Sequence, residues 1–172
     1  DNELLSFIAG EFEQRGYEIV GASEILPDLT LKPGFVCGTP YRSIQRDVEK
    51  ADKVLKLLSS EDIGQGIVVE NGLVLGIETL QGTNELLKFV KKTSVHLRIA
   101  EKGGVFVKRP KFNQNLQFDM PVIGPETINL ACNAGLRGLV VSPLSVIVLD
   151  QKKCLQIAKA NNFFILAKDS TS

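Results

Sequence analysis

The segment of residues 104–125 holds the side chains best suited to chemistry. Asp119 lies there between Phe118 and Met120, and Pro121 follows Met120. Because a proline disfavours helical backbone just before it, we expect Asp119 at the end of an extended stretch. A carboxylate in that place could coordinate Mg²⁺ or orient a water molecule. The alternative is that Asp119 only caps a turn, and the residue by itself does not decide between the two.

Two lysines precede this aspartate, one on each side of Pro110. Lys108 and Lys111 follow an apolar run at 105–107 that is typical of a buried strand. A rigid extended segment with two ammonium groups suits a phosphate or pyrophosphate, which lysine meets as a compact point charge. The competing interpretation is that both lysines only keep the edge of a sheet soluble.

Two predicted helix starts are further candidates for binding a ligand. Gly124 and Thr127 flank one of them, where free N–H groups can bind a phosphate oxygen. Glu126 in its first turn argues against an anion, because it already satisfies the helix dipole. Gly82 and Thr83 lie where a strand becomes a helix, the edge at which α/β folds bind ligands. An ordinary capping turn explains Gly82 and Thr83 equally well.

Composition and missing motifs exclude several classes of protein. The formal net charge of zero argues against a nucleic-acid partner. No P-loop, GxGxxG, GxSxG, HExxH or CxxC pair is present, and the single histidine, His96, is more typical of a structural residue. No apolar run approaches the roughly 18–20 residues that span a bilayer.

The odd number of widely spaced cysteines predicts buried thiols in a reducing compartment, at Cys37, Cys132 and Cys154.

Hydrophobic periodicity predicts an α/β fold, in which residues 1–172 form a single domain with a mixed β-sheet flanked by helices. Asn71-Gly72 predicts a β-hairpin at residues 67–78, because a type I′ turn needs two residues with positive φ. Helices are expected at 2–15, 40–60, 83–93, 125–134 and 151–161, and further strands at 17–22, 105–107, 139–141, 146–149 and 163–166. The chain starts inside a helical pattern, so we expect a fragment of a longer protein.

Several motifs, in chain order, resemble the UDP-2,3-diacylglucosamine pyrophosphatase family of lipid A biosynthesis, in its alphaproteobacterial type. They lie at 20–28, 62–65, 82–83, 104–111, 118–127 and 135–138, so the likeness covers nearly the whole chain. Members of that family are longer at the N-terminus. The resemblance therefore implies the C-terminal, substrate-binding domain of a two-domain enzyme whose N-terminal domain is absent. Such a fragment alone is expected to turn over little or nothing.

The resemblance implies a Mg²⁺-dependent hydrolase that cleaves the pyrophosphate of UDP-2,3-diacylglucosamine with water. The products would be UMP and 2,3-diacylglucosamine 1-phosphate (lipid X), and this domain would hold the acylated sugar phosphate. The resemblance also implies a cytoplasmic enzyme with at most peripheral contact with the inner membrane. It is compatible with a homodimer and implies no nucleic-acid partner.

The same resemblance assigns roles to individual residues. Asp119 would be the catalytic residue and a metal ligand, while Lys108 and Lys111 would hold phosphate oxygens. Thr83 would hydrogen-bond the substrate or a metal-bound water. A deep apolar cavity for two acyl chains is expected beside Asp119 and the lysines. The remaining substrate-binding residues would be Gly82, Gln65, Gly124 and Thr127.

The chain departs from the family pattern at three places that are usually charged. Asn84, Asn115 and Gln117 stand where the family has Asp, Asp and Arg. Two fewer carboxylates would weaken metal binding or water activation, and a missing arginine would weaken phosphate contacts. These neutral residues motivate an alternative, in which the chain is a non-catalytic module that binds a lipid or a nucleotide sugar.

Overall fold

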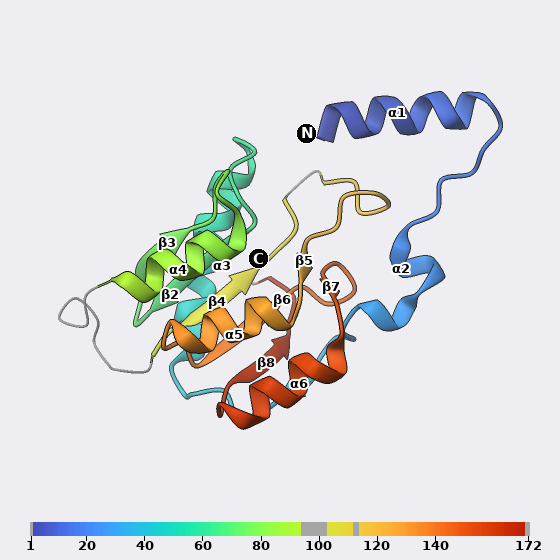
Figure 1. Cartoon of the computed structure of the whole chain (residues 1–172). Helices are drawn as coiled ribbons and strands as arrows, with labels where there is room; N and C mark the ends of the chain where they lie inside the picture. Colours follow the sequence, from blue (N-terminus) through green and yellow to red (C-terminus); the bar gives the residue numbers. More distant parts are fainter. Residues whose placement is uncertain (1, 94–102, 112–113, 171–172) are drawn as a thin grey trace.

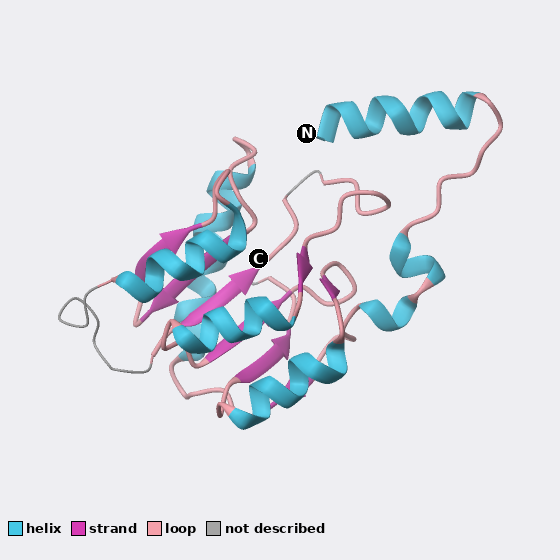
Figure 2. Cartoon of the chain, in the orientation of Figure 1, coloured by secondary structure: helices cyan, strands magenta, loops and turns pink. Residues whose placement is uncertain are grey.

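The computed structural model describes residues 2–93, 103–111 and 114–170, so His96 lies outside the described residues. These residues form the predicted α/β fold around a mixed sheet (Figures 1 and 2). Strands β4, β6 and β8 are parallel to one another. The pairs β1 with β8, β2 with β4, and β2 with β3 are antiparallel. In spatial order the strands are β1 (Val36–Cys37), β8 (Phe164–Ala167), β6 (Gly138–Val141), β4 (Val105–Lys108), β2 (Gly66–Glu70) and β3 (Leu73–Ile77).

Helices cover both faces of this sheet (Figure 1). Successive residues of a strand point to opposite faces, which divides the core into two clusters. In β2, Val68 packs in the cluster with α4, α5 and α6, whereas Ile67 and Val69 pack with α3 on the other face. The helices are α3 (Ile44–Ser59), α4 (Gly82–Lys92), α5 (Pro125–Asn133) and α6 (Gln151–Ala160). Among the described residues, no helix is both long and apolar enough to cross a membrane.

The N-terminal part of the chain differs from the prediction. Helix α1 (Asn2–Gln14) is confirmed and lies apart from the sheet (Figure 1), but the strand predicted at 17–22 is wrong. Residues 17–21 are an extended linker, and a short helix, α2 (Ala22–Ile25), begins where the strand was expected to end. Aromatic and β-branched residues favour a strand only where a neighbouring strand and a core receive them. Tyr17 and Val20 are exposed, so neither condition holds.

Most of the other predicted elements are confirmed, with shifted ends. The predicted helix at 40–60 begins only at Ile44, because residues 40–41 are irregular and 42–43 form a turn. The strand predicted at 146–149 is reduced to β7 (Ile147–Val148), which pairs in parallel with β5 (Val122–Ile123) as a separate small sheet. Neither β5, β1 nor the 3-10 helix η1 (Pro27–Leu29) was expected, since each is too short to show a periodic pattern.

The three cysteines are free thiols. Cys37 and Cys154 are buried as predicted, while Cys132 is only partly buried. Burial raises the pKa of the Cys154 thiol to about 11, which keeps it protonated and unreactive near neutral pH.

The predicted β-hairpin is confirmed and is tied to α3 by one carboxylate. Asn71 and Gly72 have φ values of 50° and 80°, as a type I′ turn requires. Asp47 in α3 accepts a hydrogen bond from the Gly72 N–H at 2.6 Å and another from the Tyr41 hydroxyl at 2.5 Å. Burial, followed by the bond to Asp47, raises the pKa of Tyr41, which therefore stays a hydrogen-bond donor.

A buried ion pair fixes α3 to the end of β4. The guanidinium of Arg109 meets Asp52, with Nε and Oδ1 3.0 Å apart and both side chains almost fully buried. Arg109 also donates to the Ser142 hydroxyl and to the backbone carbonyl of Lys168. A buried guanidinium needs such partners, since removing one leaves an uncompensated charge.

The loop before β2 passes very close to the end of the hairpin. Gly64 has a φ of +62°, and a Cβ built on it would lie 1.8 Å from the backbone oxygen of Glu78. Only a residue without a side chain fits this conformation and this contact.

We expect Gly64→Ala to lower the free energy of unfolding by about 2 kcal/mol or more, from positive-φ strain and from overlap with Glu78. Urea denaturation measures the change. Gly10→Ala is the control, because Gly10 lies inside α1 with no atom within 4 Å of a built Cβ. That control should be neutral or stabilising. An equally mild effect at Gly64 would contradict the close contact.

Candidate functional site

A pocket of about 540 Å³ lies between the N-terminal ends of α4 and α5, and we call it the α4–α5 pocket. It brings together four residues predicted for substrate binding, namely Gly82, Thr83, Gly124 and Thr127. Both helices direct free N–H groups and the positive end of their dipoles toward it, which favours an anion. The other residues of the lining are Gln81, Asn84, Val122, Ile123, Pro125, Glu126 and Leu149.

The α5 side of this pocket is partly satisfied within the chain. The Thr127 hydroxyl accepts a long hydrogen bond, 3.4 Å, from the Gly124 N–H. Glu126 is exposed in the first turn of α5, as the sequence indicated, and places a negative charge at the rim. The first turn of α4 also carries an acid, Glu85, which pairs with Lys88 at 2.7 Å. A Cβ built on Gly82 has no neighbour within 4 Å, so the α4 side is open.

Lys108 reaches the pocket only through Thr83. It is the last residue of β4 and is buried. Its Nζ lies 2.9 Å from each carboxylate oxygen of Glu78 and 2.8 Å from the Thr83 hydroxyl, so its three N–H donors all have acceptors. The Thr83 hydroxyl is also 2.8 Å from Glu78 Oε1. Lys108, Glu78 and Thr83 thus form one closed network in the pocket wall.

A glycine in the middle strand lets this network form. Gly66 of β2 pairs with Lys108 of β4, and the Gly66 carbonyl accepts the Glu78 N–H at 2.7 Å. The three residues therefore lie in a row across the sheet, with Gly66 between the acid and the lysine. A Cβ built on Gly66 would lie 2.4 Å from Glu78 Oε2. Glu78 and Lys108 meet because Gly66 has no side chain.

Lys111 also has a carboxylate partner. Its Nζ lies 2.7 Å from Oδ1 of Asp62, which is largely exposed. The hydrogen bond from Lys111, and then its positive charge, holds the pKa of Asp62 below the usual range. Gln65, in the same loop as Asp62, accepts the Arg109 N–H through its backbone carbonyl. Each predicted phosphate-binding lysine thus has its own acid, and the substrate-binding roles of Lys108, Lys111 and Gln65 stay predictions.

Asp119 is half-buried and is held by a side chain. Gln114 donates to Asp119 Oδ2 at 2.7 Å, while its own amide oxygen accepts the Lys111 N–H at 2.9 Å. The Asp119 N–H bonds to the Asn115 carbonyl at 3.0 Å. Within the described residues, no backbone N–H is donated to the Asp119 carboxylate. The bond from Gln114 orients the Asp119 carboxylate, and its catalytic and metal-binding roles stay predictions.

A metal at Asp119 would have few protein ligands. No group of three or more His, Cys, Asp or Glu among the described residues is placed to hold an ion. Mg²⁺ is commonly bound by one or two carboxylates, with water and substrate phosphates as its other ligands. A single oriented carboxylate therefore fits an ion that binds together with a diphosphate, and does not fit a cage made of protein alone.

Two of the three residues that depart from the family pattern make structural contacts. The third, Asn84, lines the α4–α5 pocket. The side chain of Asn115 accepts the Gln117 N–H, and the side chain of Gln117 donates to the Ile19 carbonyl. These bonds shape the loop before Asp119 and attach it to the linker that follows α1.

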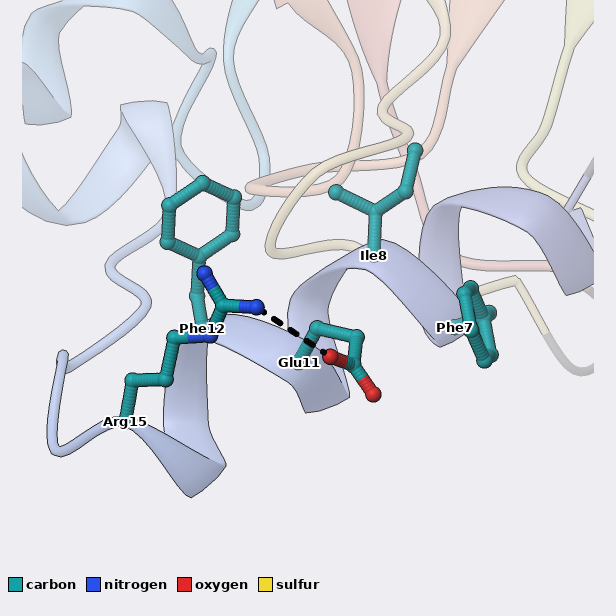
Figure 3. Close-up of a pocket in the computed structure, with 5 residues that line it drawn as sticks. All are labelled: Phe7, Ile8, Glu11, Phe12 and Arg15. Carbon is teal, nitrogen blue, oxygen red and sulfur yellow. Dashed lines mark ion pairs between the residues drawn. The ribbon is translucent and has the colours of Figure 1, made fainter.

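The apolar cavity expected beside Asp119 is not found in the two pockets described here. The α4–α5 pocket is lined by neither Asp119 nor the lysines. A smaller pocket of about 150 Å³ lies along α1 alone, where Glu11 and Arg15 form an ion pair beside apolar side chains (Figure 3). Its apolar residues are Phe7, Ile8 and Phe12.

Two residues of the site were missed by the sequence analysis. Gln114 belongs to a polar loop with several amides, and nothing in the pattern separates it from its neighbours. Glu78 carried a usable signal, because an acid directly after an apolar strand needs a partner if the strand end is buried. That partner, Lys108, is too distant in the sequence for a local pattern to indicate it.

Comparison with known proteins gives the family. Residues 32–166 match the LpxI C-terminal domain family. The chain is also 36% identical over 172 residues to the UDP-2,3-diacylglucosamine pyrophosphatase LpxI of Caulobacter vibrioides. That match covers 98% of this chain but only 61% of the relative, so the chain spans less than two thirds of the relative's length. Both findings agree with the resemblance carried by the motifs, and the chain belongs to the LpxI C-terminal domain family.

Proposed function

We propose that the chain is the substrate-binding C-terminal domain of a UDP-2,3-diacylglucosamine pyrophosphatase of lipid A biosynthesis. The reaction adds water across the diphosphate and gives UMP and 2,3-diacylglucosamine 1-phosphate. The observation that carries the proposal is the α4–α5 pocket, where two helix N-termini gather four residues of the family motifs. The family match and the name of the Caulobacter relative support the choice of substrate.

The geometry suggests a division of labour in this reaction. The N-termini of α4 and α5 would hold phosphate oxygens of the acylated sugar, and the Lys108 network would stiffen that wall. Asp119, oriented by Gln114, would hold Mg²⁺ beside the diphosphate. The ion, when bound, neutralises diphosphate charge and polarises the attacked phosphorus. Positioning and charge neutralisation are the main contributions of a protein to phosphoryl transfer.

The proposal extends to the rest of the protein. The chain covers 61% of the relative, and we propose that the remaining part closes the site over the substrate. That part would supply the walls of the acyl-chain cavity that the two pockets of this domain lack. The proposed reaction takes place in the cytoplasm, with at most peripheral contact with the inner membrane.

A non-catalytic binding module is the second candidate. The specific observation in its favour is that Asn115 and Gln117, neutral where the family is charged, are used in bonds that shape their own loop. Release of UMP by the full-length protein separates the two candidates, because a binding module would retain UDP-2,3-diacylglucosamine without cleaving it.

We expect Asp119→Asn in the full-length protein to lower kcat by about 100-fold or more, because the amide cannot replace a metal-binding carboxylate. UMP release from UDP-2,3-diacylglucosamine with Mg²⁺ measures the effect. Asp169→Asn, which neutralises an exposed aspartate near the C-terminus, is the matched control and should be fully active. Full activity of the Asp119 variant would contradict its role, and no UMP release from the folded wild type would contradict the proposed reaction.

Removal of the metal tests the proposed Mg²⁺ dependence independently of any substitution. Incubation with EDTA should abolish UMP release, and added Mg²⁺ should restore it, because a single protein carboxylate binds the ion weakly without the diphosphate. Thermal unfolding without substrate should change little on chelation, since no structural cage is lost. Undiminished hydrolysis in EDTA would remove Mg²⁺ from the proposal.

A further inference from the structure

Glu78 connects the end of the hairpin to the wall of the α4–α5 pocket. We infer that Glu78 is a positioning residue for the proposed reaction, which it serves by holding Lys108 and orienting the Thr83 hydroxyl toward substrate. The inference rests on the proposed function and concerns how this pocket recognises its ligand. Glu78 lies between two of the motifs that carried the family resemblance, those at 62–65 and 82–83, and belongs to neither.

The first argument is the direction of the hydrogen bonds. An ionised carboxylate only accepts hydrogen bonds and an ammonium group only donates them. The Thr83 hydroxyl therefore donates its hydrogen to Glu78 and accepts one from Lys108. One lone pair of Thr83 remains free, so Thr83 can accept one further hydrogen bond but cannot donate one. A ligand hydroxyl, amide N–H or water satisfies that lone pair, whereas a phosphate oxygen does not.

The second argument is that the neighbouring chain leaves room for this residue. Cβ atoms built on Gly64 and Gly66 would lie 1.8 Å from the backbone oxygen of Glu78 and 2.4 Å from Oε2. Gly64 makes room for the backbone of residue 78, whatever its side chain, whereas Gly66 makes room for the Glu78 carboxylate itself. The space left by Gly66 is more than a solvated surface acid needs.

The third argument is the location of the network. Asp52 and Arg109 form another buried pair, and Arg109 directly follows Lys108 in the sequence. Arg109 also donates to the Ser142 hydroxyl and to the Lys168 carbonyl. Neither Asp52 nor Arg109 lines the α4–α5 pocket, whereas Thr83 does. The two pairs have similar burial, and only the Glu78 pair reaches the pocket. Asp52 is therefore a matched control for the loss of a buried carboxylate.

The experiment compares Glu78→Gln and Asp52→Asn in the full-length protein. Each replaces a buried carboxylate by an amide of nearly the same shape, so both should lower the melting temperature. We expect only Glu78→Gln to lower kcat/KM for UMP release, by about tenfold or more per folded molecule, because the amide no longer fixes the ammonium and hydroxyl groups. Asp52→Asn should keep wild-type kcat and KM.

Thr83 tests the same inference without a change of charge. Thr83→Val removes the hydroxyl that accepts a hydrogen bond from the ligand and should lower kcat/KM. Thr83→Ser keeps that hydroxyl and should retain activity. If Glu78 acts through Thr83, the double variant Glu78→Gln/Thr83→Val should be no worse than the poorer single variant, which is non-additive behaviour. If Glu78→Gln does not fold, Thr83→Val and Thr83→Ser test the inference instead. Full activity of Thr83→Val overturns it.

The outcomes separate this inference from the proposed function. If the wild type releases UMP but Glu78→Gln matches Asp52→Asn in kcat and KM, Glu78 is only structural and the inference is wrong. If the folded wild type releases no UMP, the proposed function is wrong, and the inference that rests on it is withdrawn too.

Discussion

The charge of Lys108 is the constraint on which the rest of the site depends. Lys108 ends a central strand whose residues are all buried, and an ammonium group there needs a negative partner within hydrogen-bonding distance. Glu78 is that partner, and it can reach Lys108 because strands β3 and β4 run in the same direction and both end at this edge. The same edge then begins α4 with Gly82 and Thr83. Satisfying one buried charge thus sets the position of the helix that borders the pocket.

The switch of strand direction explains why the pocket lies where it does. The sheet is parallel from β8 through β6 to β4, and β2 runs against them. Ligands of α/β sheets bind beyond the carboxyl ends of parallel strands, where helices begin. The α4–α5 pocket follows this rule, because α4 starts directly after the hairpin and α5 starts after the short strand β5. The turn after β3 and the start of α4 therefore form one wall, and β5 and the start of α5 form the other.

Features determined by local chemistry could be predicted from the sequence, and features that depend on distant partners could not. The hairpin followed from Asn71-Gly72, whose backbone preference acts within the turn itself. Residues 17–22 have strand-like composition, yet no strand forms, because neither a paired strand nor the core receives their large side chains. Lys108 was predicted to hold a phosphate, and that role stays a prediction. Its burial with Glu78 depends on Gly66, a residue of another strand, and no local pattern contains that information.

The row of Glu78, Gly66 and Lys108 has a consequence for how the sequence can change over time. Any side chain at position 66 would occupy the space of the carboxylate, and loss of either charged residue would leave the other buried alone. Single substitutions at these positions are therefore costly, although a joint replacement of all three by apolar residues could be tolerated by the fold. The three positions are therefore coupled, so that a change at one of them is tolerated only with matching changes at the other two.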